Sequence, residues 1–142
     1  MPSAVRPPSG SKQVSPSGGS QLKHLDQARR NYRVYSLLRD DDFVDWAATA
    51  LFYTAMHVVE AWLEEALGTT SGSHDSRAMR MNRLGVPRRV FQAYDALRRA
   101  SELARYRDWT ALLDADRIAS LCNGPYRLIC EHFEAPDAIT PD

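Results

Sequence analysis

The sequence predicts an all-α fold, an antiparallel bundle of four to five helices, on three observations. Apolar residues recur at spacings of three and four through most of the chain, which is the period of an amphipathic helix. Gly, Pro and Ser gather in short segments between these stretches, and short connections make successive helices antiparallel. With 142 residues, 44% of them hydrophobic, the chain is long enough for one ordinary core but short for two. We therefore expect a single helical domain.

The two ends of the chain differ from its middle. Residues 1–20 are rich in Pro, Ser and Gly and show no apolar periodicity, so we expect a disordered tail there. Residues 136–142 contain two prolines and several polar residues, and we expect a flexible C-terminus. The helical domain is accordingly predicted over residues 21–135.

Two long helices are predicted in the first half of the domain. Periodic apolar residues mark the first over about residues 20–39. The aspartates at 40–42 then offer an N-cap and favourable first-turn charge for a second helix. That helix should end at Leu67, because Gly68 supplies a C-terminal stop.

A short third helix should follow a loop rich in Thr, Ser and Gly. Either Ser73 or Ser76 can cap its start, since a hydroxyl oxygen accepts from a free N–H group of the first turn. We expect this helix to end near Gly85.

A fourth helix and a last helical region complete the predicted bundle. Pro87 suits the first turn of the fourth helix, whose apolar stripe includes Tyr94 and which should run to about Arg107. Either of two acids, Asp114 or Asp116, can open the last region, which should end at about Phe133. Within that region we expect a break or kink at 123–125, because a proline disfavours helical geometry in the residue before it.

The second helix carries two different faces. One is an apolar stripe that runs from Val44 to Ala66. Nearly opposite lies a row of two aromatic rings, one imidazole and two carboxylates: Trp46, Tyr53, His57, Glu60 and Glu64. This row either packs on another helix, with His57 as a hydrogen-bonded core residue, or forms part of a dimer interface or a pocket.

Charge is segregated along the chain, although the formal net charge is zero. Residues 40–66 contain seven acids and no Lys or Arg, a net charge of −7. Residues 77–107 contain nine arginines and two acids, a net charge of +7. The arginines either form a phosphate-binding stripe, which would bind nucleic acid in a salt-dependent way, or pair with the acids across the bundle.

Several classes of protein and site have no signature in the chain. No apolar run approaches the roughly 18 residues of a membrane-spanning helix, so we expect no membrane partner. No hydrophobic segment follows Arg6, which speaks against a secretory signal and leads us to expect a cytoplasmic location. Cys122 and Cys130 are too few for a disulfide framework, and we expect them reduced and buried. Because the chain also lacks a Gly-rich phosphate loop, a nucleophile elbow and a paired-cysteine motif, we predict no cofactor.

Three motifs occur in a recognisable order. They are the run Ala-Leu-Phe-Tyr-Thr-Ala-Met-His at 50–57, the turn from Ser73-His74 to Arg77, and Ala-Arg-Tyr at 104–106. In this order the chain resembles the HEPN superfamily of small helical domains, many of which handle RNA or nucleotides, over roughly residues 22–134. The resemblance implies a helical bundle, a homodimer and an accessory role in association with RNA or nucleotides. As binding residues we select two histidines at positions where similar members carry them and three arginines of the basic stretch: His57, His74, Arg77, Arg98 and Arg105.

The same resemblance gives an alternative function of the enzyme class. Active ribonucleases of the superfamily carry an Arg, four to six residues and a His, and dimerisation brings two copies over one phosphodiester. Arg127 and His132 have this spacing and follow a turn at 124–125, although Leu128 stands where ribonuclease members usually have a polar residue. Arg would stabilise phosphate charge and His would transfer a proton. The alternative is therefore a metal-independent endoribonuclease of the toxin or phage-defence type, with Arg127 and His132 as catalytic residues.

Two further possibilities remain open from the sequence. Some superfamily members are interaction partners of a small nucleotidyltransferase, so a purely protein-binding role is one of them. A metal site is the other, because helical bundles sometimes bind metal through His and Glu of facing helices, here His57, Glu60, His74 and His132. The chain has no second closely spaced ligand pair, and we predict no metal.

Overall fold

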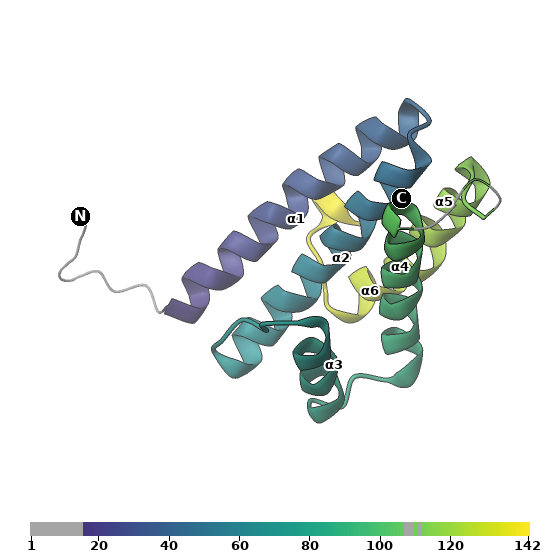
Figure 1. Ribbon diagram of the computed structural model, residues 1–142. Helices are drawn as coiled ribbons and strands as arrows, with labels where there is room; N and C mark the ends of the chain where they lie inside the picture. Colours follow the sequence, from purple (N-terminus) through teal and green to yellow (C-terminus); the bar gives the residue numbers. More distant parts are fainter. Residues whose placement is uncertain (1–15, 107–109, 111) are drawn as a thin grey trace.

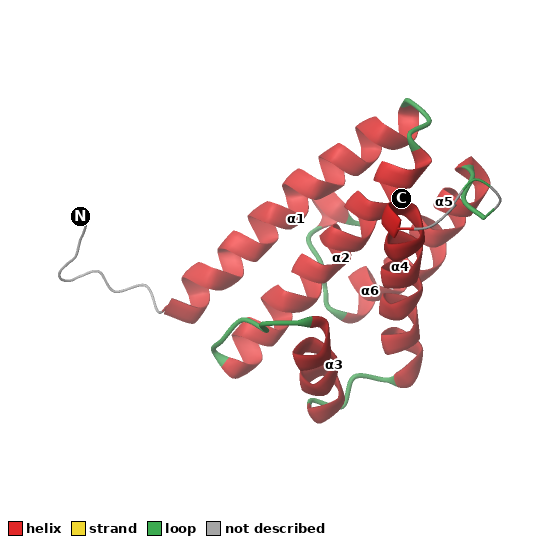
Figure 2. Ribbon diagram, viewed as in Figure 1, coloured by secondary structure: helices red, strands yellow, loops and turns green. Residues whose placement is uncertain are grey.

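The computed structural model describes residues 16–106, 110 and 112–142. Throughout these residues the regular structure is helical and no strand is formed (Figure 2). Helices α5 and α6 are joined by a π-helical turn into one continuous stretch, so the described chain forms five helical rods and a short 3₁₀ turn. The predicted all-α bundle is confirmed.

Helix α2 (Val44–Leu67) is the centre of the bundle. It makes its most extensive contact with α1 (Pro16–Asp40), which lies beside it, and its next most extensive with α4 (Arg88–Tyr106) (Figure 1). Helix α5 (Ala115–Leu121) packs against α2, and α6 (Arg127–His132) and the π-helical turn pack against both α2 and α4. Helix α2 is therefore buried on most of its circumference, which accounts for its apolar composition.

The polar row of α2 is buried over its second half. Glu60 and Glu64 are almost inaccessible to solvent, and Tyr53 and His57 are half-buried. Trp46, at the other end of the row, is 56% exposed. The interpretation that this row packs on other elements therefore holds from Tyr53 onward and is wrong for Trp46.

The three aspartates before α2 end α1 instead of capping α2. Asp42 has a φ of +66°, in the left-handed region that Asp tolerates better than most residues. Its N–H donates to Arg39 O at 3.1 Å and the Phe43 N–H donates to Leu38 O at 2.8 Å, which is the Schellman pattern of a helix C-terminus. The N-cap of α2 is Phe43, and no side chain caps it. The expectation of an aspartate N-cap was wrong, because the same residues close the preceding helix.

Other predicted helix ends are confirmed. Ser73 Oγ accepts from Ser76 N at 3.1 Å and caps α3 (His74–Arg83), as expected for one of the two serines. Asp114 caps α5 through Arg117 N at 2.7 Å. Gly68 ends α2 with a φ of +81°, a conformation that glycine adopts without strain. Helix α4 begins directly after Pro87, and the predicted end near Arg107 falls outside the described residues.

The expected break at residues 123–125 does not occur. Cys122–Tyr126 form a π-helical turn that contains Pro125, and the backbone stays helical into α6. A π turn is wider than an α turn, and such turns often absorb a residue that cannot take part in the regular hydrogen-bond ladder. The expected break is therefore wrong, because a local rule against proline does not anticipate this solution, whereas a kink at this turn stays a prediction.

Both terminal tails were predicted too long, and the helical domain was predicted too short. Helix α1 already begins at Pro16, whereas residues 1–15 of the expected tail lie outside the described residues. At the other end, Asp137–Ile139 form a 3₁₀ turn, and the Ile139 side chain is buried. Tyr126 donates its hydroxyl to Ile139 O at 2.6 Å, so this segment packs on the bundle.

Candidate functional site

A buried ion pair joins α2 to α3. Arg77 Nε donates to Glu60 Oε2 over 2.5 Å, and the Glu60 and Arg77 side chains are 1% and 7% exposed. The other oxygen, Glu60 Oε1, accepts from the main-chain N–H of Ser71, in the loop between the two helices, at 2.9 Å. Both carboxylate oxygens therefore have partners, as a charge with so little access to water requires.

Arg77 also contacts two ring side chains. Its Nη1 donates to the hydroxyl of Tyr94 on α4 at 3.0 Å and lies 3.0 Å from His74 Nδ1. The Tyr94 hydroxyl lies 3.3 Å from the same His74 nitrogen. One guanidinium thus connects α2, α3 and α4, and the exposed ring of His74 is the end of this network that meets solvent.

Two arginines of α4 lie near this ring. Arg98 and Arg105 are seven residues apart, about two turns, and so share one face of the helix. Partial burial, followed by the charges of Arg77, Arg98 and Arg105, lowers the pKa of His74. Arg105 Nη1 donates to the Tyr53 hydroxyl at 2.9 Å, and its guanidinium lies 5.5 Å from the centroid of that ring. Four of the five binding residues selected from the sequence therefore lie in one neighbourhood, around His74, with Arg77 buried beneath the surface.

The fifth selected residue, His57, belongs to a separate chain of hydrogen bonds. His57 Nδ1 lies 2.9 Å from Nδ1 of His24 on α1, and His24 Nε2 lies 3.2 Å from Thr70 Oγ1. Thr70 donates its single hydroxyl proton to Glu64 Oε1 at 2.5 Å, so its oxygen must accept from His24 Nε2. In a neutral His24 ring, Nδ1 then accepts from His57. Burial, with a smaller contribution from the charge of His24, lowers the pKa of His57 to about 4.

The predicted catalytic pair, Arg127 and His132, lies on α6. Side chains five residues apart on a helix point about 140° away from each other, so this pair does not face a single point within one chain. Arg127 donates to the main-chain oxygens of Pro141, at 3.0 Å, and of Asp142. The His132 ring packs 4.8 Å from the ring of Phe133. Catalysis by this pair stays a prediction, and it would need a second copy of the chain.

The four side chains considered as metal ligands lie in different surroundings. His57 contacts α1, Glu60 is held by Arg77, and His132 packs on aromatic rings. Glu60 and His74 both contact Arg77, whose guanidinium stands between their polar atoms. Among the described residues, no three His, Cys, Asp or Glu side chains are arranged to hold a metal ion.

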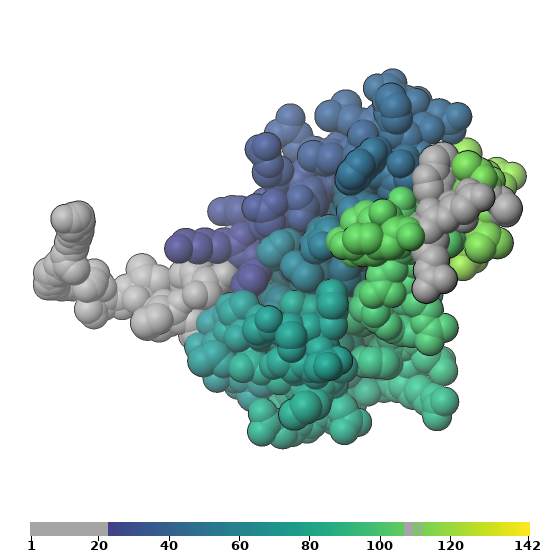
Figure 3. Space-filling view, in the orientation of Figure 1, coloured from purple at the N-terminus to yellow at the C-terminus, as the bar shows by residue number. Residues whose placement is uncertain are grey.

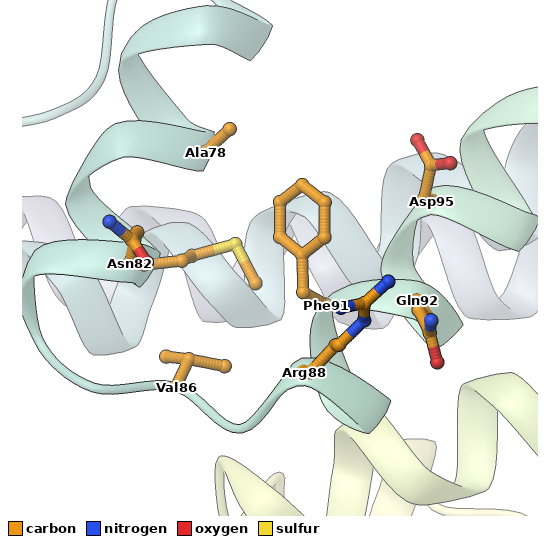
Figure 4. A pocket seen from close by; sticks show the side chains of 8 residues that line it. Ala78, Asn82, Val86, Arg88, Phe91, Gln92 and Asp95 are labelled. Carbon is orange, nitrogen blue, oxygen red and sulfur yellow. The ribbon is translucent and has the colours of Figure 1, made fainter.

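A pocket of about 590 Å³ opens between α3 and α4, which form neighbouring parts of one face of the molecule (Figures 3 and 4). Ala78 of α3 and Phe91 of α4 border the same space, and Arg88 lies at its edge (Figure 4). Asp95, in its wall, accepts from Arg98 at 2.8 Å, so the pocket adjoins the face that carries His74. None of its lining residues is among those selected from the sequence: Ala78, Met81, Asn82, Val86, Arg88, Phe91, Gln92 and Asp95.

Some residues of the site were not predicted from the sequence. Tyr94 is predicted only as part of an apolar stripe, yet its hydroxyl completes the Arg77 network. The signal that could have found it is that a buried tyrosine hydroxyl needs a hydrogen-bond partner. His24 and Thr70 gave no signal, because their bonds join segments 33 and 46 residues apart in the sequence.

Comparison of the chain with models of known families, with curated proteins and with solved structures finds no match. In the part of the chain that the structure describes, no helix is both long enough and apolar enough to cross a membrane. The function must therefore be inferred from the chemistry of the side chains themselves.

Proposed function

We propose that this chain is a HEPN-like helical domain that acts, as a homodimer, as an accessory protein associated with RNA or nucleotides. The observation that supports this most directly is that the acidic part of the chain does not neutralise the basic part. Among the described residues, one ion pair joins the acids of α2 to the arginines of α3 and α4, the buried pair of Glu60 and Arg77. Pairing across the bundle therefore accounts for little of the charge.

The remaining arginines pair along their own helix, donate to neutral oxygens or face solvent. Arg98 binds Asp95 at 2.8 Å and Glu102 at 2.7 Å, which uses the two acids of α4. Three exposed arginines make no ion pair with the described residues: Arg83, Arg88 and Arg89.

Two of the four acids of α2 are poorly placed to offset this surface charge. Glu60 and Glu64 are both buried and hydrogen-bonded within the bundle. The face formed by α3 and α4 thus keeps an excess of positive charge, and such a surface attracts phosphate groups in a salt-dependent way.

The test is the binding of a fluorescein-labelled single-stranded RNA to the full-length protein, followed by fluorescence anisotropy at several salt concentrations. We expect the logarithm of the binding constant to fall linearly with the logarithm of the salt concentration. The double variant Arg88→Gln, Arg89→Gln should bind more weakly, with a slope shallower by about 0.7 for each phosphate that the variant no longer neutralises.

The matched control is Arg30→Gln, Arg33→Gln, which removes the same charge from exposed positions of α1. This control should leave the salt slope unchanged. Binding that does not depend on salt, or equal losses in the two double variants, would contradict the proposal.

Catalysis is a second candidate that rests on the two partly exposed residues of α6, Arg127 and His132. Because they point in different directions on one helix, a composite site would need each copy of a dimer to contribute. The oligomeric state therefore decides whether the endoribonuclease alternative is physically available. Binding to a small nucleotidyltransferase is a third candidate, which follows from the resemblance alone.

A further inference from the structure

The direction of each hydrogen bond around His74 follows from the chemistry of its partners. A guanidinium only donates, so His74 Nδ1, 3.0 Å from Arg77 Nη1, must be an acceptor. Tyr94 accepts from Arg77 Nη1 at 3.0 Å, and its own hydroxyl proton can be donated to the same His74 nitrogen, 3.3 Å away. Two donors thus meet at Nδ1. The proton of the neutral ring must therefore sit on Nε2.

The surrounding network holds this tautomer in place. Arg77 is fixed by Glu60, and Glu60 is fixed in turn by the Ser71 N–H. A second proton on the ring of His74 would place a positive charge directly against the Arg77 guanidinium. Partial burial and the neighbouring arginines lower the pKa of His74 for the same reason, so the ring is neutral at pH 7.

The exposed side of the ring offers one donor. His74 is exposed to solvent, and Nε2 has no hydrogen-bond partner among the described residues. The ring of His74 lies 5.7 Å from the ring of Phe52, and this contact limits the rotation of the imidazole. A ring whose Nδ1 is occupied and whose Nε2 is protonated has no free lone pair, so it cannot serve as a general base.

Arg105 reaches the neighbourhood of His74 through two aromatic rings. It contacts Tyr53, whose ring lies 5.3 Å from the Phe52 ring, and the Phe52 ring lies 5.7 Å from that of His74. The Arg105 charge is one of those that lower the pKa of His74.

Arg105 Nε and Nη1 donate to two neutral oxygens, Ser101 O at 3.2 Å and the Tyr53 hydroxyl at 2.9 Å. It makes no ion pair with the described residues, unlike Arg98, which is bound by two carboxylates. Its remaining nitrogen, Nη2, is available to a ligand.

We propose that His74 is a neutral hydrogen-bond donor locked by Arg77, and that its Nε2–H forms, with Arg105, a binding site for a phosphoryl oxyanion. The neutral ring binds and polarises the oxyanion but does not exchange a proton with it, as neutral imidazoles do where a cation or dipole suppresses their protonation. The source of the oxyanion rests on the proposed association with RNA or nucleotides. It is either the phosphomonoester of a nucleotide or the phosphodiester of an RNA.

Two probes distinguish these sources. One is the dinucleotide UpU, whose phosphodiester keeps one negative charge between pH 8 and pH 5.5, and the other is uridine 5′-monophosphate. Affinities are measured by calorimetry with the full-length protein. Tighter binding of the monophosphate assigns the site to a nucleotide, and tighter binding of UpU assigns it to RNA.

The variants test the role of each group. His74→Ala and Arg105→Gln should each weaken binding of the preferred probe about tenfold, whereas His74→Gln, which keeps an N–H donor, should stay within about threefold of the unmodified protein. Arg30→Gln, on the exposed surface of α1, is the matched control for loss of charge. Thermal unfolding of each variant shows whether the bundle is intact, and Arg105→Gln leaves the network at Nδ1 untouched.

Two measurements would overturn the locked tautomer. The first is affinity for UpU that rises as the pH falls through about 6.5 in the unmodified protein but not in His74→Gln, since this would mean that an imidazolium binds the ligand. The second is a long-range ¹H–¹⁵N NMR spectrum that places the proton of His74 on Nδ1.

The two proposals fail separately. Loss of oxyanion binding in His74→Ala together with no binding of longer RNA would leave the site standing and remove the RNA-associated function. RNA binding and small-probe binding that are both unchanged in His74→Ala and Arg105→Gln would remove the site and leave the RNA-associated function.

Discussion

His57 is the residue whose ionisation should couple most directly to folding. Its pKa is lowered to about 4 in the folded protein, first by burial and then by the charge of His24, whereas an exposed histidine titrates near 6.5. The unfolded chain therefore binds a proton at a higher pH than the folded chain does. The free energy of unfolding should be unaffected above about pH 7 and should fall as the pH drops from about 6.5 to 4. Because the ring is only half-buried, we expect a loss of roughly 1–2 kcal/mol.

Urea unfolding at a series of pH values measures this effect. His57→Gln keeps an amide that can donate to His24 but does not titrate, so its stability should fall less steeply over the same window. His132→Gln removes a histidine whose ring packs on Phe133 without a hydrogen bond among the described residues, and serves as the matched control. A pH dependence identical in the unmodified protein and in His57→Gln would show that this ring is not responsible.

The sequence could predict single residues of the site only where their chemistry was unusual for their position. His74 and Arg77 stand out beside a glycine-bearing loop, and the structure places them in direct contact. Which of several arginines would lie near that histidine is not decided by the sequence, because it depends on how α3 is docked against α4. Tyr94 was predicted as core, and it is buried, but no local pattern shows which group its hydroxyl binds.

Among the elements, α3 is the one that depends most on a single side chain. It makes few contacts with the rest of the bundle, and its only fully inserted side chains are those of Arg77 and Met81. Removing the arginine would leave the Glu60 carboxylate buried without its charge partner. We expect Arg77→Ala to lower the free energy of unfolding by roughly 3–5 kcal/mol. Amide hydrogen exchange should accelerate most in α3 and in the loop that contains Ser71.

A partly exposed pair provides the comparison for this loss. Arg98→Ala removes an arginine that is bound to acids of its own helix, and it should cost at most about 1 kcal/mol. The double variant Glu60→Gln, Arg77→Met should recover part of the loss, because it leaves no buried charge unpaired. Similar losses in Arg77→Ala and Arg98→Ala, measured by urea unfolding, would mean that the buried pair does not anchor α3.

The elements were predictable where a local rule governs their ends. Ser73 and Asp114 cap helices through bonds to residues three positions further on, which a sequence can show. Asp42 was misjudged because an aspartate can stand at the start or at the end of a helix. Pro125 was misjudged because a proline can break a helix or be taken up in a π turn. Burial of Ile139 was missed because it depends on contacts with distant helices that the sequence does not display.

On the scale of the whole molecule, the zero net charge is the sum of an acidic segment and a basic segment, and the two segments place their charged side chains differently. The carboxylates of α2 at Glu60 and Glu64 face inward, where each accepts a hydrogen bond from the loop that follows the helix. Of the eight arginines of α3 and α4, four are exposed and one, Arg77, is buried. A chain with zero net charge can therefore have a basic face. This face can be recognised only once the structure shows that Glu60 and Glu64 are buried.

The turn between α1 and α2 is the region where we expect a second copy of the chain to pack. Four of the large apolar side chains that the structure leaves exposed lie within thirteen residues at this turn: Val34, Leu37, Phe43 and Trp46. Exposed apolar side chains gathered at one turn are typical of an interface, and in a homodimer with twofold symmetry the same patch serves both copies. We expect the full-length protein to sediment as a dimer at micromolar concentration. Trp46→Glu should shift it to a monomer, because it places a charge in the patch.

Met79→Glu is the matched control, since Met79 is 71% exposed on α3, away from this turn, and its substitution should leave the dimer intact. The same preparations decide between the functional alternatives. A composite site of Arg127 and His132 requires two copies, so an endoribonuclease should cleave RNA in the presence of a chelator and lose this activity in His132→Ala. It should also lose the activity in Trp46→Glu if this patch brings the two α6 helices together. A protein that sediments as a monomer throughout would exclude the composite site, whereas the oxyanion site at His74, which lies within one chain, would be unaffected.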